Sequence, residues 1–147
     1  MPTTPSRSAT GGTAEVFCET PRLTIRIMRS ADAPAFAAYR NDPAVAKHQL
    51  WELPYTHADA LEVLADQDEL TDLRVGGWTQ LAVERRDTPG VIGDVCCHLD
   101  DTGAVAEIGY TLATAHQGHG YAREAAGALL AALFERPELV RATAELD

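Results

Sequence analysis

The sequence predicts a mixed α/β domain in which helices flank one central sheet, with the element order β-α-α-β-β-β-α-β. Residues 23–28 (LTIRIM) alternate between apolar and polar side chains, which is typical of a half-buried strand. Two helix starts follow, and then three strand-like runs, a glycine loop and a long apolar helix pattern. With 147 residues, 46% of them hydrophobic, the chain suits a single domain with its own core.

Both early helices have recognisable starts. We expect Ser30 to cap the first helix, with Asp32 in its first turn. The sequence Asn-Asp-Pro at residues 41–43 ends this helix, because the residue before a proline disfavours the helical conformation. Thr56 is followed three residues later by Asp59, which resembles the capping box that begins a second helix.

Three strands are expected after these helices. Residues 78–84 and 91–99 form two of them, joined by a turn at residues 86–90 (RDTPG). A second turn, Asp-Asp-Thr-Gly at residues 100–103, leads into a strand over residues 104–112. The three strands therefore follow one another directly through short turns.

The last expected elements are a helix from Tyr121 to about the Arg-Pro pair at residues 136–137 and a strand over residues 140–146. Residues 1–15 are rich in Thr, Ser, Pro and Gly, so we expect a disordered leader there. The folded domain is expected over residues 16–147.

Composition narrows the class of protein. A net charge of −10 disfavours binding to nucleic acid, since phosphate backbones require clustered Lys and Arg. No apolar stretch is long enough to cross a membrane and no secretory signal is evident, so we expect a cytoplasmic protein. The run Cys96, Cys97 and His98 lacks a second ligand pair at zinc spacing, so we expect no metal.

Two groups of residues have both a structural and a functional interpretation. Acidic side chains are dense between residues 59 and 72, either as a solvated helix face or as a rim that attracts a cationic amine. Trp51 and Tyr55 lie between the two early helices, where they either line an acceptor pocket or pack in the core.

Residues 115–122 (AHQGHGYA) form a short glycine loop between a strand and a helix. The first turn of a helix offers several backbone N–H groups and roughly half a positive charge. Gly118 and Gly120 carry no Cβ, so a bulky anion can lie against the main chain. The loop lacks the Gly-Lys-Ser/Thr of nucleotide hydrolases and the three glycines of the dinucleotide fingerprint. It is either a pyrophosphate-binding loop or a plain helix-capping loop.

Gln117, Gly120 and Ala122 fit a third loop pattern and resemble the coenzyme A loop of the GNAT superfamily of acetyl-CoA-dependent N-acetyltransferases. Four other segments, in the expected order, resemble the branch that includes the ribosomal-protein alanine N-acetyltransferases. They are residues 19–26 (ETPRLTIR), 41–43 (NDP), 90–94 (GVIGD) and 107–112 (EIGYTL). The resemblance runs from about residue 18 to the last residue and implies the GNAT sheet with its flanking helices.

The resemblance implies transfer of an acetyl group from acetyl-CoA to a primary amine, without a metal. The diphosphate of coenzyme A would be held by the backbone of the loop residues Gln117, Gly118, His119, Gly120, Tyr121 and Ala122. Pantetheine would lie along residues 104–112, where a bulge at Thr111 and Leu112 would free an N–H for the thioester oxygen. An ordinary strand end at these two residues is the alternative.

Two carboxylates are candidates for the general base that takes the proton of the amine. Glu107 is the first, because it lies on the strand next to the expected cofactor. Glu145 is the second, because it lies on the last strand, where some ribosomal-protein alanine acetyltransferases carry their base. The alternative for each is a solvated or ion-paired glutamate.

Members of this superfamily continue for about 30–40 residues after the strand that corresponds to residues 140–146. The expectation is therefore a C-terminally incomplete domain that lacks the usual last helix and two strands. A homodimer in which a second copy completes the sheet is one outcome. The expected acceptor is a protein N-terminal amine, with an aminosugar or another small-molecule amine next. The competing hypothesis is a catalytically silent domain that binds coenzyme A or a partner chain.

Overall fold

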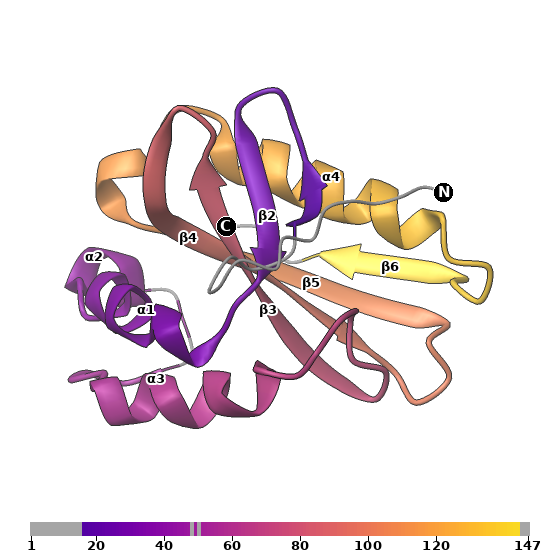
Figure 1. The fold of residues 1–147 in the computed structure, drawn as a ribbon, viewed down its shortest axis with the longest axis horizontal. Coiled ribbons are helices and arrows are strands. Elements are labelled where there is room, and N and C mark those ends of the chain that lie inside the picture. Colours follow the sequence, from indigo (N-terminus) through magenta and orange to yellow (C-terminus); the bar gives the residue numbers. More distant parts are fainter. Residues whose placement is uncertain (1–15, 48, 50, 145–147) are drawn as a thin grey trace.

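The computed structural model describes residues 16–47, 49 and 51–144. The predicted leader at residues 1–15 and the candidate Glu145 lie outside the described residues. Six strands form one sheet in the spatial order of their sequence (Figure 1). The strands are β1 Val16–Glu19, β2 Leu23–Ile27, β3 Gly77–Arg85, β4 Thr88–Leu99, β5 Val105–Leu112 and β6 Arg141–Ala144. Neighbouring strands are antiparallel except for β5 and β6, which are parallel.

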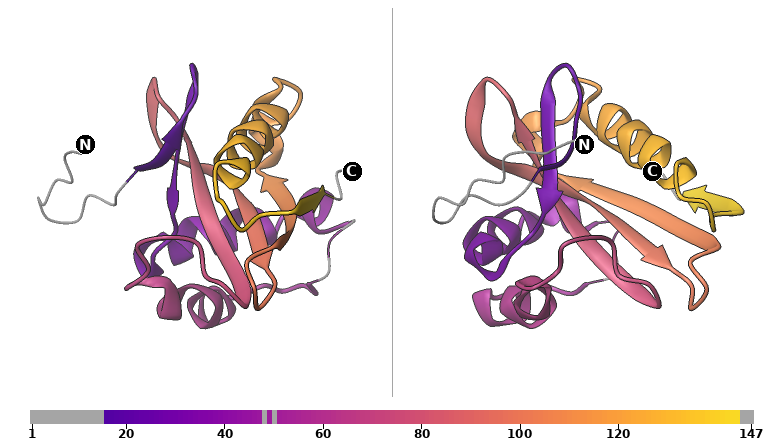
Figure 2. Two further views of the ribbon diagram at one scale, coloured as in Figure 1. Left: turned by 90° about the vertical axis from the view of Figure 1, so that its right-hand side faces the viewer. Right: turned by 45° about the vertical axis from the view of Figure 1, so that its right-hand side comes forward.

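Helices cover both faces of the sheet, as the predicted fold class requires (Figure 2). The helices are α1 Ala33–Arg40, α2 Pro43–Ala46, α3 His57–Leu64 and α4 Tyr121–Phe134. One face packs α4 against alternate apolar residues of β2 to β5 and forms the larger core, which includes Leu81, Leu99 and Leu129. The other face packs α1 and α3 around Phe36 and Met28. No helix in the described part of the chain is long and apolar enough to cross a membrane.

The second predicted helix start is confirmed, and the first is corrected. The Thr56 side chain accepts a hydrogen bond from the Asp59 amide at 3.0 Å, and the Asp59 carboxylate accepts one from the Thr56 amide at 2.8 Å. Ser30, in contrast, caps no helix, because a 3₁₀ turn over Ser30–Asp32 precedes α1. Asp32 stabilises this turn, since its carboxylate accepts from the Arg29 amide at 2.9 Å.

The Asn-Asp-Pro segment both ends α1 and begins α2. The helix α1 ends at Arg40, as predicted, and the Asp42 carboxylate then accepts a hydrogen bond from the Ala44 amide at 2.9 Å. Pro43 occupies the first position of α2, where its missing N–H costs nothing. The sequence analysis missed this one-turn helix, because Asp-Pro is a helix start as well as a helix stop.

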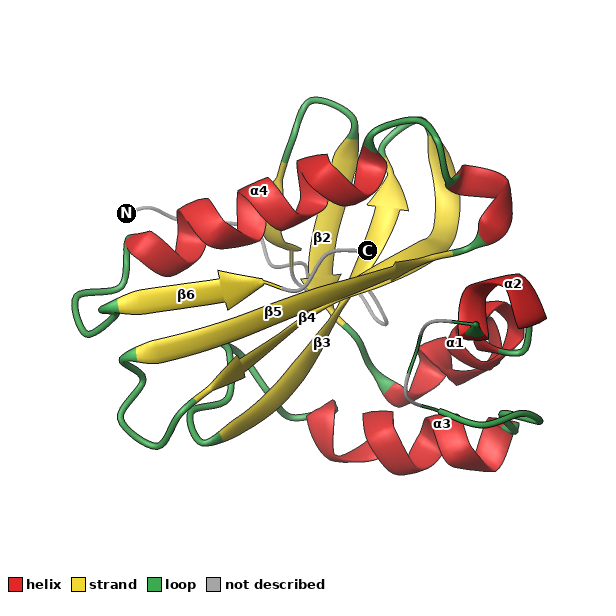
Figure 3. Ribbon diagram, turned by 180° about the vertical axis from the view of Figure 1, so that it is seen from behind, coloured by secondary structure: helices red, strands yellow, loops and turns green. Residues whose placement is uncertain are grey.

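The edges of the sheet differ from the prediction. The strand β1 was not predicted, and β4 begins at Thr88, earlier than expected. The parallel pairing of β5 with β6 ends at Ile108 and Ala144, so β6 lies beside only part of β5 (Figure 3). The described register of β6 on β5 covers Val105 to Ile108.

Candidate active site

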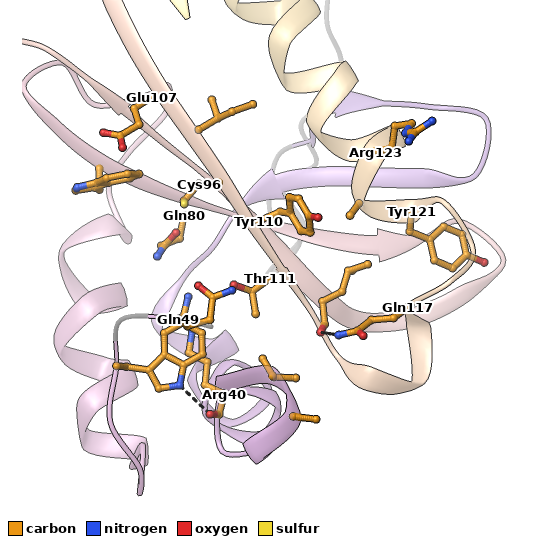
Figure 4. A pocket seen from close by; sticks show the side chains of 18 of the residues that line it. Arg40, Gln49, Gln80, Cys96, Glu107, Tyr110, Thr111, Gln117, Tyr121 and Arg123 are labelled. Atoms are coloured by element: carbon orange, nitrogen blue, oxygen red, sulfur yellow. Dashed lines mark hydrogen bonds between the residues drawn. The ribbon is translucent and has the colours of Figure 1, made fainter. Parts of the chain in front are cut away.

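A pocket of about 1100 Å³ lies between the sheet, the segment from α1 to α3 and the start of α4 (Figure 4). The sheet contributes residues of β3, β4 and β5, and β5 lines the pocket continuously from Glu107 to Leu112. The segment from α1 to α3 contributes Arg40, Gln49 and Trp51. The glycine loop and the first residues of α4 form the remaining wall. The predicted cofactor loop and the predicted cofactor strand therefore border one cavity.

The glycine loop carries a run of backbone donors that bond to no acceptor in the described part of the chain. Gly118 and Gly120 have φ values of 85° and 81°, in the left-handed region that favours glycine. Gly120 is the N-cap of α4 and provides no side-chain cap. The first backbone hydrogen bond of the helix runs from the Glu124 amide to the Gly120 carbonyl oxygen. Within the described residues, the amides from Gly118 to Arg123 find no acceptor. Such amides, at the positive end of a helix dipole, favour an anion.

The loop is tied to the strand that it follows. The Gln117 side chain donates a hydrogen bond from Nε2 to the Leu112 carbonyl oxygen at 3.1 Å. The hydroxyl of Thr114 donates to the Asp42 carboxylate at 2.7 Å, which joins the loop to the start of α2. The predicted loop residue His119 is exposed, and its ring lies 5.6 Å from that of Tyr121. Ala122 lines the pocket from the first turn of α4.

The charges beside the loop are partly compensated. Glu124 lies in the first turn of α4, and its carboxylate accepts from the Arg22 Nε at 2.7 Å and the Arg22 amide at 3.1 Å. The Arg22 guanidinium also lies 4.5 Å from the centre of the Tyr121 ring. Arg123 lines the pocket and forms no ion pair with a described carboxylate. The balance at the start of α4 therefore favours a negatively charged group.

Thr111 and Leu112 are both buried at the end of β5. Their register with β4 is regular from Ala106 to Leu112, so the bulge that the resemblance implied is not found in the described pairing. Gly93 lies opposite Leu112, and a Cβ there would meet the Thr111 carbonyl oxygen at 2.3 Å. The close approach of β4 to this end of β5 therefore requires glycine.

Glu107 lies at the other end of the same face of β5. Its neighbours in register are His98 on β4 and, beyond it, Trp78 on β3. The rings of Trp78 and His98 lie 5.1 Å apart, and Trp78 and Glu107 both line the pocket. Glu107 is exposed, so water reaches its carboxylate. The sequence analysis predicted Glu107 but not its aromatic neighbours.

A buried charged cluster lies near Thr111 and was not predicted from the sequence. Asp94 lies opposite Thr111 in register, accepts a hydrogen bond from the Tyr39 hydroxyl and lies 3.5 Å from Arg40 Nη2. Burial raises the pKa of the Asp94 carboxyl, while Arg40 and the Tyr39 hydroxyl oppose this rise. Burial and the adjacent Asp94 raise the pKa of the Tyr39 phenol. Trp51 lines the pocket here, whereas Tyr55 packs in the core of α1 and α3.

Most of the acidic stretch has structural partners. Asp68 accepts hydrogen bonds from the amide and hydroxyl of Ser30, both at 2.7 Å. Asp66 pairs with Arg74 at 3.3 Å, and Asp72 pairs with Arg136 at 3.2 Å. None of these three carboxylates lines the pocket.

Cys96 and Cys97 lie on opposite faces of β4. Cys96 lines the pocket, and burial raises the pKa of its thiol to about 12, which keeps it protonated at neutral pH. Cys97 packs in the core under α4. Among residues 16–47, 49 and 51–144, no group of His, Cys, Asp and Glu side chains is arranged to hold a metal ion.

Comparison with known proteins agrees with this geometry. Residues 22–147 match the model of the acetyltransferase (GNAT) domain. The chain is 31% identical over 130 residues to "Uncharacterized N-acetyltransferase p20" of Bacillus licheniformis, covering 87% of this chain and 71% of that protein. These two matches establish the family.

Solved structures show the same fold. The apo structure of RimL, a ribosomal L7/L12 alpha-N-protein acetyltransferase, has a TM-score of 0.68 at 15% identity, covering 90% of this chain and 72% of that one. Aminoglycoside acetyltransferase AAC(6')-Ib, solved in complex with coenzyme A, has a TM-score of 0.62 at 22% identity, covering 80% and 70%. The fold, the family model and the curated relative together lead to one conclusion: the chain belongs to the GNAT family of acetyltransferases.

Proposed function

We propose that this acetyltransferase uses acetyl-CoA as its acetyl donor and a primary amine as its acceptor. The observation that carries the proposal is the run of backbone amides from Gly118 to Arg123, without described acceptors, at the edge of a large pocket. A diphosphate supplies the oxygens that these amides lack. Coenzyme A in the complex of AAC(6')-Ib supports the same donor for a chain of the same fold.

In this proposal the backbone of Gln117, Gly118, His119, Gly120, Tyr121 and Ala122 holds the diphosphate. Pantetheine lies along β5 and reaches the backbone at Thr111 and Leu112, where an N–H stabilises the thioester oxyanion. Gly118 fits such a ligand, since a Cβ built there meets nothing within 4 Å and the space beside the main chain is open. Acetyl transfer needs an accurately held thioester, and the hydrogen bond from Gln117 to Leu112 joins the loop to that strand.

Glu107 is the proposed general base. Its carboxylate lines the pocket and is exposed, and the thioester end of the strand lies four residues away, about 13 Å along an extended chain. One bridging water spans much less than this distance, so Glu107 acts as the base only through a chain of ordered waters. Glu145 remains the second candidate for this role.

The proposed acceptor is a protein N-terminal amine, as in the ribosomal-protein branch that the sequence motifs resemble. The TM-score of 0.68 with RimL, a ribosomal L7/L12 alpha-N-protein acetyltransferase, supports this choice. An aminosugar is the second candidate, favoured by the structural similarity to an aminoglycoside acetyltransferase.

One experiment tests the donor and the reaction together. Release of free thiol from acetyl-CoA is measured with a panel of peptides and aminoglycosides, beside calorimetric titration of coenzyme A. The proposal expects binding of coenzyme A and turnover with at least one amine. Binding without turnover supports the catalytically silent domain, and the absence of binding contradicts the proposal.

A further inference from the structure

Arg40 is a buried cation with a donor that no described group satisfies. Its side chain lines the pocket although the residue is only 8% exposed. Its Nε is buried and has no described hydrogen-bond partner, and its Nη2 lies 3.5 Å from the Asp94 carboxylate. A buried N–H without an acceptor is costly, so a ligand that brings an oxygen to it gains correspondingly.

The guanidinium of Arg40 is held in one orientation by aromatic rings. Its central carbon lies 4.0 Å from the centre of the Phe36 ring and 3.9 Å from that of Trp51. The Trp51 indole N–H also donates to the Arg40 carbonyl oxygen at 2.9 Å, which fixes this wall to the end of α1. Rings on its faces leave only the edge of the guanidinium for hydrogen bonds, so its direction is set before a ligand arrives.

This cation lies near the expected site of the chemistry. Asp94 pairs in register with Thr111, and Arg40 Nη2 lies 3.5 Å from the Asp94 carboxylate. Figure 4 shows Arg40 and Gln49 on the side of the pocket toward Thr111, and Glu107 farther along the strand. An amine that attacks a thioester held at Thr111 comes within about 3–3.5 Å of its carbonyl carbon. An acceptor that reaches this thioester from the side of Arg40 brings the atoms next to its amine to the guanidinium.

We propose that Arg40 binds an acceptor oxygen adjacent to the reacting amine, as in an α-aminoacyl group. This inference rests on the proposed function and narrows the class of primary amine that the enzyme accepts. A peptide N-terminus supplies such an oxygen as its first carbonyl, and a free amino acid supplies it as a carboxylate. A simple alkylamine has no such oxygen and leaves the Arg40 donor unsatisfied, so the pocket selects against it.

Matched small amines test the contact. Alaninamide, free alanine and isopropylamine share the carbon skeleton around the amine and differ in the neighbouring oxygen. We expect the wild-type enzyme to favour alaninamide or alanine over isopropylamine in kcat/KM. In Arg40→Lys and Arg40→Met this preference falls by about tenfold or more, the scale of one hydrogen bond to a charged group. The comparison between variants cancels the intrinsic reactivity of each amine. The ratio of kcat/KM for alaninamide to that for alanine shows whether the oxygen comes from a carbonyl group, as in a peptide, or from a carboxylate.

Arg123→Met is the matched control, because Arg123 also lines the pocket but lies on α4. It should change KM for acetyl-CoA and leave the preference among amines unchanged. Circular dichroism and thermal unfolding confirm that each variant folds, and Arg40→Lys retains the positive charge if Arg40→Met does not fold.

Binding is measured separately by NMR titration of the three amines into the coenzyme A complex. Equal affinities for alaninamide, alanine and isopropylamine would overturn the inference, as would a preference that both Arg40 variants retain. The reaction is also run with succinyl-CoA, a donor that bears a carboxylate. If kcat/KM depends on Arg40 with succinyl-CoA but not with acetyl-CoA, the inference is overturned. If no amine releases thiol while the oxygen-bearing amines still bind through Arg40, the proposed reaction fails and only the binding contact with Arg40 stands.

Discussion

The hydroxyl of Thr114 donates a 2.7 Å hydrogen bond to the carboxylate of Asp42, and this bond joins the start of the glycine loop to the start of α2. The second oxygen of the same carboxylate accepts from the Ala44 amide at 2.9 Å and caps α2. These hydrogen bonds keep the pKa of the Asp42 carboxyl below its ordinary value. One side chain therefore connects the glycine loop with the start of α2.

Thr114→Val removes this connection without removing the cap. We expect KM for acetyl-CoA to rise a few-fold with little change in kcat, because the loop loses one of its two described side-chain anchors. Thr102→Val is the control: it removes a 2.8 Å hydrogen bond to Asp100 in a turn outside the pocket. Steady-state kinetics on both variants checks the prediction, and equal KM values for acetyl-CoA would contradict it.

Gly120→Ala is expected to weaken coenzyme A binding. Alanine at a φ of 81° costs roughly 1–2 kcal/mol in the left-handed region, and its Cβ would meet Arg22 Nη2 at 3.4 Å. The control is Gly127→Ala in the exposed middle of α4, where a Cβ meets nothing within 4 Å. This control should stabilise the fold by about 1 kcal/mol and leave the coenzyme A Kd unchanged. Calorimetry and thermal unfolding measure both effects. An unchanged Kd for coenzyme A in Gly120→Ala would contradict the role of the glycine loop in binding coenzyme A.

Glu107→Gln should lower kcat at neutral pH and shift the acid limb of the pH–rate profile, because glutamine cannot accept the proton. The neighbouring His98→Asn, which lies beside Glu107 in register, is the comparison. This variant keeps a polar side chain at residue 98 and leaves the Glu107 carboxylate in place, so the acid limb of its pH–rate profile should follow that of the wild type. A Glu107→Gln profile that overlays the wild-type profile would remove Glu107 from the mechanism.

Asp94→Asn should change how stability depends on pH. The pKa of the Asp94 carboxyl in the folded protein is raised above its ordinary value of 3.8, mainly by burial. The folded state therefore holds this proton more tightly than the unfolded state, and the wild type loses stability as pH rises from about 4 through the folded pKa. The asparagine side chain does not titrate, so the stability of the variant relative to the wild type should increase over that window. Urea unfolding at a series of pH values measures the difference, and a flat or falling difference would contradict this account.

The parts of the site that could be predicted from sequence are those encoded locally. The glycine loop, the strand over residues 105–112 and the capping box at Thr56 each depend on a few adjacent residues, and each lies where its pattern predicted. The match of the family model to residues 22–147 confirms the family that the glycine loop and the four other segments resemble.

Arg40 and Asp94 could not be predicted, because their environment exists only in the folded chain. An arginine at the end of an amphipathic helix is ordinarily solvated, and nothing in the sequence around Arg40 indicates that Trp51 and Phe36 enclose it. Asp94 lies within the strand predicted over residues 91–99, and the pattern of that strand does not show which face of the sheet carries the carboxylate. The contact between them joins residues far apart in sequence, so only the packing of α1 against β4 reveals it.

The central claim is that the backbone at the start of α4 binds the diphosphate of an acyl carrier, and amide NMR tests it most directly. Titration of ¹⁵N-labelled protein with coenzyme A should shift the resonances of Gly118 to Arg123 far more than those of the β4–β5 turn at residues 100–103. If those loop resonances stay in place at saturating coenzyme A, the account is contradicted.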